Sequence, residues 1–107
     1  MTDVKNVFSE HVINNVLAER GNRYGAFDRH AQITQDLKRV MHHSPKWRNL
    51  TASQKEAMEM IAHKMGRMLN GDVTYADNVV DIIGYATLML NDMRTAAMFN
   101  ETNVPGK

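Results

Sequence analysis

The chain has 107 residues, which suffices for one modest domain and excludes two. With 43% hydrophobic residues it is expected to fold, and its formal net charge of +1 creates no field that would attract nucleic acid or a membrane surface. The absence of cysteine excludes disulfides and thiolate zinc sites and suits the cytoplasm, where we expect the protein to reside. No stretch is apolar for long enough to cross a bilayer, so no membrane partner is expected.

The apolar residues recur at helical spacing, and no strand-like alternation competes with that pattern. We therefore expect a single all-α domain over residues 1–100, built as a four-helix bundle-like fold, with a polar tail over residues 101–107. The first helix is expected over residues 4–19, and Gly21 is expected to end it.

Residues 20–27 read as a loop that concentrates two arginines and two aromatic residues. In one interpretation Arg20 or Arg23 contacts a phosphate, while Tyr24 or Phe27 stacks on a base. In the alternative, the segment is a tight interhelical turn whose aromatic residues fill the core and whose arginines lie in solvent.

A second helix is expected over residues 27–42, ended by the break at Pro45. Trp47 is expected to pack the following loop onto the bundle. Thr51 or Ser53 then begins the third helix, and a capping box formed by Ser53 and Glu56 would keep Glu56 from binding a ligand.

The third helix, up to the stop at Asn70-Gly71, has two different sides. At about 100° per residue, one polar stripe with Lys64 beside it carries Glu56, Glu59, His63 and Arg67. The other side is apolar and carries Ala57, Met58, Ile61, Ala62, Met65, Met68 and Leu69. The helix is therefore expected to bury one side and to present two carboxylates on the other.

The fourth helix is apolar around nearly its whole circumference, which is typical of a buried helix. Its polar patch consists of Asp77, Asn78, Asp81 and Tyr85. A buried carboxylate must be paired, hydrogen-bonded or bound to metal, so Asp81 is expected to have a partner. A monomer would expose one side of this helix, and we therefore expect a homo-oligomer, a dimer that buries the helix centrally and builds the site partly across the interface.

These acidic positions resemble the all-α nucleoside triphosphate pyrophosphohydrolases, the MazG-like group. The resemblance is carried by Glu56-x-x-Glu59, then a loop, then Asn78-x-x-Asp81. In that family a Glu-Glu-x-x-Glu helix and a Glu-x-x-Asp helix bind Mg²⁺, which holds the triphosphate. This chain departs from the pattern at two positions, because Lys55 and Asn78 stand where the family has Glu.

The resemblance implies Mg²⁺-dependent cleavage of nucleoside or deoxynucleoside triphosphates. The residues that it assigns to the metal are Glu56, Glu59 and Asp81, and the same three are assigned to catalysis. Asp77 is a further metal candidate that could replace the missing charge from a neighbouring position, or it only caps the start of its helix. The residues expected to bind the substrate are Arg23, Tyr24, Lys64, Arg67, Asn78 and Tyr85. Lys64 and Arg67 would neutralise the acids when no cation is bound and would hold phosphate oxygens when substrate is present.

The whole chain also resembles a group of small phage and prophage proteins without an established function. Four recurring segments carry this resemblance, an Arg-Tyr-Gly-x-Phe segment, a His-Lys-x-x-Arg segment, an Asn-Gly-Asp turn and an Asp-Asn-x-x-Asp-Ile-x-Gly-Tyr segment. They stand here at residues 23–27, 63–67, 70–72 and 77–85.

Three alternatives to the enzyme remain open. The acids can simply neutralise the cations of the third helix in a structural network. The chain can bind a nucleotide without turnover, and in a phage this would sequester a signal of host defence. It can also be an inhibitor that binds a host protein through a methionine-rich surface, since nine methionines make an adaptable contact surface.

Overall fold

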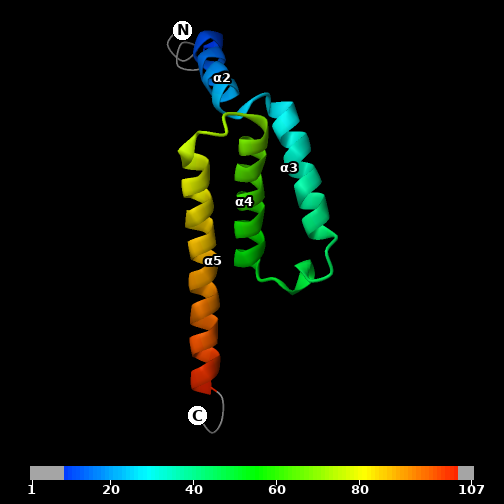
Figure 1. Cartoon of the computed structure of the whole chain (residues 1–107), viewed down its shortest axis with the longest axis vertical. Coiled ribbons are helices and arrows are strands. Elements are labelled where there is room, and N and C mark those ends of the chain that lie inside the picture. Colours follow the sequence, from blue (N-terminus) through cyan, green and yellow to red (C-terminus); the bar gives the residue numbers. More distant parts are fainter. Residues whose placement is uncertain (1–8, 104–107) are drawn as a thin grey trace.

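The computed structural model describes residues 9–103 of the chain and the side chains of residues 9–98. Within this range the chain folds into four α-helices and a short 3₁₀ helix, and it contains no strand (Figure 1). The elements are α2 (Glu10–Tyr24), α3 (Phe27–His42), η1 (Trp47–Asn49), α4 (Ala52–Asn70) and α5 (Ala76–Asn103). The prediction of an all-α protein with four helices is therefore confirmed.

Three of the helices form a single layer rather than a closed bundle. Figure 1 shows α3, α4 and α5 side by side with α4 in the middle, while α2 lies beyond the end of the layer where α4 ends and α5 begins. The molecule extends over 70 × 32 × 25 Å, and its radius of gyration is 19.6 Å. A compact chain of this length would have a radius of gyration of about 13 Å, so the molecule is far more extended than a closed bundle.

The two ends of α2 differ from the predicted helix. Ser9 caps its start by accepting a hydrogen bond from the Val12 backbone N–H. The first part of the predicted helix, residues 4–8, lies outside the described residues. Gly21 does not end the helix, which continues to Tyr24. Gly25 ends it instead, because its φ of 79° lies in the region that favours glycine.

The start of α4 settles which residue caps it. Thr51 accepts a hydrogen bond from the Gln54 backbone N–H, and the Gln54 side chain accepts one from the Thr51 backbone N–H. This capping box replaces the predicted pair of Ser53 and Glu56, so Glu56 has no capping role. At the other end of the chain, α5 continues to Asn103, past the residue at which a tail was predicted to begin, and residues 104–107 lie outside the described part.

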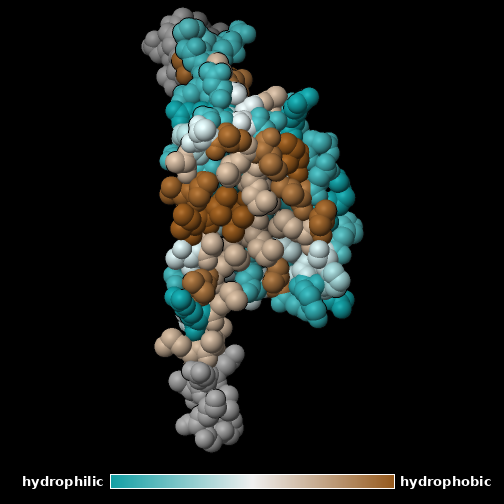
Figure 2. Space-filling model, in the orientation of Figure 1, coloured by the Kyte–Doolittle hydropathy of each residue, from teal (hydrophilic) through white to brown (hydrophobic). Residues whose placement is uncertain are grey.

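The layer has two chemically different faces. Around α4, Met58 and Met65 lie on one side, while Glu56, His63 and Arg67 lie on the opposite side. Figure 2 looks onto the side on which apolar side chains gather over α3, α4 and α5. The polar stripe predicted for the third helix therefore forms the middle of the opposite face, which we call the polar face.

The fully buried core within residues 9–98 is small. Its only apolar members are Ala57 and Ala62, and four polar residues are also buried, namely His30, Thr34, Lys64 and Asn78. The expectation that the last helix is buried is wrong for a single chain, because Val80 and Ile83 of α5 are 59% and 60% exposed. None of the described helices combines the length and apolar character needed to cross a bilayer.

Candidate functional site

The turn between α2 and α3 contacts the turn between α4 and α5 at the end of the layer where α4 ends. The Asn70 side-chain amide donates hydrogen bonds to the backbone oxygens of Tyr24 and Ala26, both at 2.9 Å, and the Asp72 backbone N–H donates to the Arg23 oxygen at 2.7 Å. Gly71 lies against the Tyr24 backbone so closely that a Cβ there would overlap it. The α2–α3 turn and the α4–α5 turn, which the sequence presents as separate motifs, are thus one structural unit.

This contact stacks arginines on tyrosines. The Arg67 guanidinium carbon lies 4.0 Å from the centre of the Tyr24 ring, and the Arg23 guanidinium carbon lies 4.6 Å from the centre of the Tyr75 ring. The two tyrosine rings meet edge to face at 6.1 Å. Such cation–π contacts orient the guanidinium planes. Arg23 Nη2 is also paired with Glu19 Oε1 at 3.3 Å.

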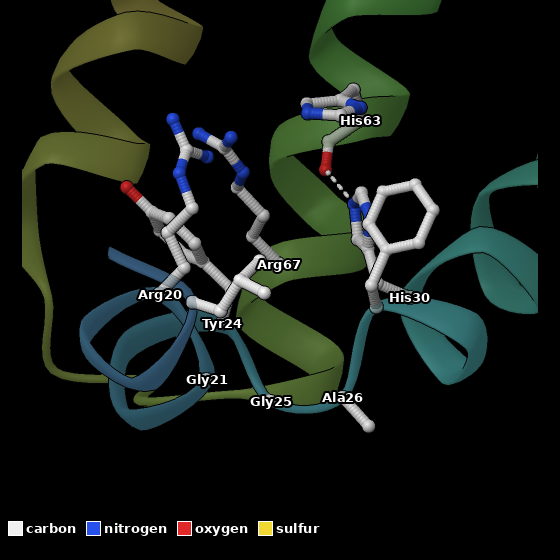
Figure 3. A pocket seen from close by; sticks show the side chains of 10 residues that line it. Arg20, Gly21, Tyr24, Gly25, Ala26, His30, His63 and Arg67 are labelled. Carbon is white, nitrogen blue, oxygen red and sulfur yellow. Dashed lines mark hydrogen bonds between the residues drawn. The ribbon is translucent and has the colours of Figure 1, made fainter. Parts of the chain in front are cut away.

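A cavity of about 300 Å³ opens beside the stacked Arg67 and Tyr24. Its lining residues include Leu17, Arg20, Tyr24, Phe27, His63 and Arg67. Figure 3 shows the side chains of Arg20 and Arg67 extending together on the Tyr24 side, with His30 and His63 across from them. We call this space, with two cations, aromatic rings and apolar walls, the arginine cavity.

Two histidines form the wall of the arginine cavity between α3 and α4. His30 is buried, and its Nε2 donates to the backbone oxygen of His63 at 3.1 Å and lies 3.2 Å from Thr34 Oγ1. The His63 ring stands perpendicular to the His30 ring at 4.6 Å. Burial, followed by the positive charge of Arg67, lowers the pKa of His63 to about 4, so this ring is neutral at pH 7.

The predicted acidic cluster is divided among several separate contacts. Glu59 accepts a hydrogen bond from His42 Nε2 at 2.9 Å, and Asp77 accepts one from the Tyr75 hydroxyl at 2.9 Å, which raises the pKa of that hydroxyl. Asp81 Oδ2 pairs with Lys64 Nζ at 2.9 Å. Glu56 lines a groove between α4 and α5 that also contains Tyr85.

Within residues 9–98, no three His, Asp or Glu side chains come close enough together to hold a metal ion. Mg²⁺ takes oxygen ligands in near-octahedral geometry, usually one or two carboxylates supplemented by water and phosphate. Glu56, Glu59 and Asp81 each face a different neighbour, so the side chains of one chain do not fit the three-carboxylate site that the sequence predicts. The assignment of Mg²⁺ stays a prediction.

The structure places the remaining predicted binding residues unequally. Arg23, Tyr24 and Arg67 come together at the contact between the two turns. Lys64 is only 9% exposed and is paired with Asp81. Asn78 is 1% exposed, and its side-chain nitrogen has no hydrogen-bond partner within the described part of the chain. Because both side chains are buried, neither reaches a ligand on the surface of this conformation.

Sequence reasoning missed the role of His30. The residue carries no motif, and its helix position marks it only as one of several polar residues of α3. The signal that could have found it is Gly66, since a glycine in the middle of a helix often marks close approach of another element. A Cβ at Gly66 would indeed lie 2.5 Å from Thr34 Oγ1 and 3.1 Å from the His30 ring.

Comparison with known proteins identifies a family but no activity. The chain matches none of the curated proteins. It also matches none of the solved structures. One family model matches residues 9–92, which include the contact between the two turns and the whole arginine cavity. The chain therefore belongs to the family described as "Domain of unknown function (DUF6378)".

Proposed function

We propose that the protein binds a nucleoside phosphate in the arginine cavity. The observation that carries the proposal is that Arg20, Arg67 and Tyr24 line the same cavity, with the Arg67 guanidinium 4.0 Å from the Tyr24 ring. Planar guanidinium groups match phosphate oxygens with paired hydrogen bonds, and the stacked ring keeps one of them oriented. The cavity volume of about 300 Å³ is at the lower end of the range for small-molecule pockets.

The walls of the cavity suit the other parts of such a ligand. Leu17 and Phe27 supply apolar surface, and Phe27 is 79% exposed, so its ring is free to lie against a base. His63 is neutral at pH 7 and adds no further positive charge, but its ring can still donate or accept one hydrogen bond. The ligand that fits is therefore an anion with an attached aromatic group rather than a bare phosphate.

The test is calorimetric titration of the full chain with nucleoside mono-, di- and triphosphates. Arg67→Ala is expected to weaken binding by roughly 10- to 100-fold, because a hydrogen bond to a charged group contributes about 1.5–3 kcal/mol. Arg94→Ala is the matched control, since Arg94 is an exposed arginine far along α5. This variant should bind nucleotides with the affinity of the wild type. Absence of binding by every nucleotide at millimolar concentration contradicts the proposal.

A second candidate is the Mg²⁺-dependent hydrolysis that the MazG-like resemblance implies. The observation in its favour is the pair of Asp81 and Lys64, because Lys64 was expected to neutralise the acids when no cation is bound. The panel of triphosphates would be incubated with Mg²⁺ and with EDTA, and the products separated by chromatography. Monophosphate formed only with Mg²⁺, lost in Asp81→Ala and kept in Asp36→Ala, would support the enzyme.

If nucleotides bind and no product forms, binding without turnover is the function, and sequestration of a nucleotide signal is the role that it would serve. The residues that line the arginine cavity belong to α2, α3, α4 and the turn between α2 and α3. The homo-oligomer expected from the sequence stays a prediction and is tested separately from nucleotide binding.

A further inference from the structure

The side of the α3–α4–α5 layer opposite the polar face consists of apolar side chains, and we call it the apolar face. A groove of about 460 Å³ in its middle is lined by residues that include Leu37, Val40, Met41, Met58, Met65 and Met89. At about 100° per residue, Ile82 and Met93 lie within about 40° of Met89 on the same side of α5. In Figure 2 these helices present a nearly continuous apolar surface along the length of α4.

A single chain leaves too much apolar surface in water. Sixteen large apolar side chains within residues 9–98 are more than 40% exposed, against two small alanines that are fully buried. Stable domains pack two layers of secondary structure around a shared core, and within residues 9–103 the helices α3, α4 and α5 supply one layer. Covering these side chains would add hydrophobic stabilisation against the conformational entropy that is lost on folding.

We propose that a second copy of this chain covers the apolar face and forms a two-layer homodimer with it. The face is roughly 28 Å long by the rise per residue of α4 and roughly 28 Å wide by helix spacing, which gives a footprint of about 800 Å². This area equals the roughly 800 Å² that each partner buries in a standard stable interface. The footprint is therefore large enough for a dimer without any additional contact.

The chemistry of the face favours an identical partner over a different one. The residues lining its groove carry no charge, so nothing there would select a charged partner. A two-fold contact places the same methionine-rich groove on both sides, and methionine side chains adapt to each other.

This arrangement places the polar face of each copy outward. His63 and Arg67 lie on the side of α4 opposite Met65, so the arginine cavity of each copy stays open to solvent in the dimer. The interface thus differs from the predicted one, which surrounded the last helix and ran through the site.

The experiment uses the absence of cysteine in the native chain. Met65→Cys and Val80→Cys introduce one thiol each, Met65 in the middle of the apolar face and Val80 on the side of α5 away from it. In a single chain the two positions are comparably accessible, at 42% and 59% exposed. In the dimer, the thiol of Met65→Cys should react with a thiol reagent at least about tenfold more slowly, because it becomes accessible only when the dimer opens.

Sedimentation of the wild type and of both variants gives the mass in parallel, and labelling in denaturant gives the intrinsic reactivity of each thiol. Twice the mass of one chain together with protection confined to Met65→Cys supports the proposal. A folded monomer at micromolar concentration overturns it. A dimer in which both thiols react equally fast also overturns it, since the copies then meet through another surface.

Discussion

At the scale of single residues, Gly66 sets how closely α3 and α4 approach. A Cβ at this position would lie 2.5 Å from Thr34 Oγ1, which is closer than Cβ atoms come to their neighbours. We expect Gly66→Ala to destabilise the protein by about 1–3 kcal/mol, since overpacking outweighs the gain of about 1 kcal/mol in helix propensity. Urea unfolding measures the difference.

Gly84 provides the matched control for that substitution. It is also a glycine within a helix, but a Cβ there would meet nothing within 4 Å. Gly84→Ala should therefore stabilise the protein by about 0.5–1 kcal/mol. Equal stability of the two variants would contradict the close packing of α3 on α4.

His63 should make stability depend on pH. Its pKa of about 4 in the folded protein is below the ordinary value of 6.5, so between these values the unfolded chain binds a proton that the folded chain does not. This contribution is fully present above pH 6.5 and is lost as the pH falls towards 4. Denaturant unfolding at pH 7.5 and pH 5 should show a smaller loss of stability in His63→Gln than in the wild type, and equal losses would contradict the low pKa.

The pairing of Lys64 with Asp81 shows what a helical wheel can predict at this scale. The wheel placed Lys64 beside the acidic stripe, and the structure joins it to Asp81 at 2.9 Å. The sequence pattern predicted a buried Asp81, and this is wrong. Lys64 is the buried residue of the pair, while the Asp81 side chain is 46% exposed. The wheel gives the angle of each residue around its own helix, and burial depends on how the two helices are rotated against each other.

At the scale of elements, one asparagine fastens the two turns to each other. Asn70→Ala removes two hydrogen bonds, to the Tyr24 and Ala26 backbone oxygens, and should destabilise the docked position of α2 by about 1–3 kcal/mol. Hydrogen exchange of the α2 amides should accelerate. Asn91→Ala, at an exposed position of α5, should leave that exchange unchanged, and similar exchange in both variants would contradict the role of Asn70.

The ends of elements were harder to predict than the elements. Both Gly21 and Gly25 fit a helix stop in the sequence, but only Gly25 has a positive φ, and its conformation is fixed by contact with Asn70 far along the chain. Thr51 and Ser53 were both acceptable caps of α4, and the side chain of Gln54 decided between them. Local patterns leave such choices open because tertiary contacts resolve them.

At the scale of the whole molecule, helical periodicity predicted four helices but not their arrangement. Short connections favour antiparallel neighbours, which holds for α3, α4 and α5 (Figure 1), whereas α2 extends beyond the end of the layer. The sequence pattern also could not show that the acids of α4 and α5 turn to different neighbours. Gathering them into one site requires a particular rotation of both helices, and apolar packing determines that rotation.

A dimer that shares its core should unfold at a temperature that depends on protein concentration. Raising the concentration a hundredfold should raise the melting temperature, because association of two chains is part of folding. Differential scanning calorimetry from about 5 μM upward provides the measurement, and the reference for dilution effects is a monomeric protein of similar size. A melting temperature independent of concentration would show that each chain folds alone.

The placement of α2 has a consequence for measured affinities. α2 has no buried residue, yet it supplies Arg20 and Tyr24 to a cavity whose other guanidinium, Arg67, belongs to α4. Any ligand that contacts both helices binds only the docked population of α2, so its apparent dissociation constant is the intrinsic one divided by the docked fraction. Substitutions in the α4–α5 turn would therefore alter affinity without touching the ligand, and saturating ligand would in turn protect α2 from proteolysis.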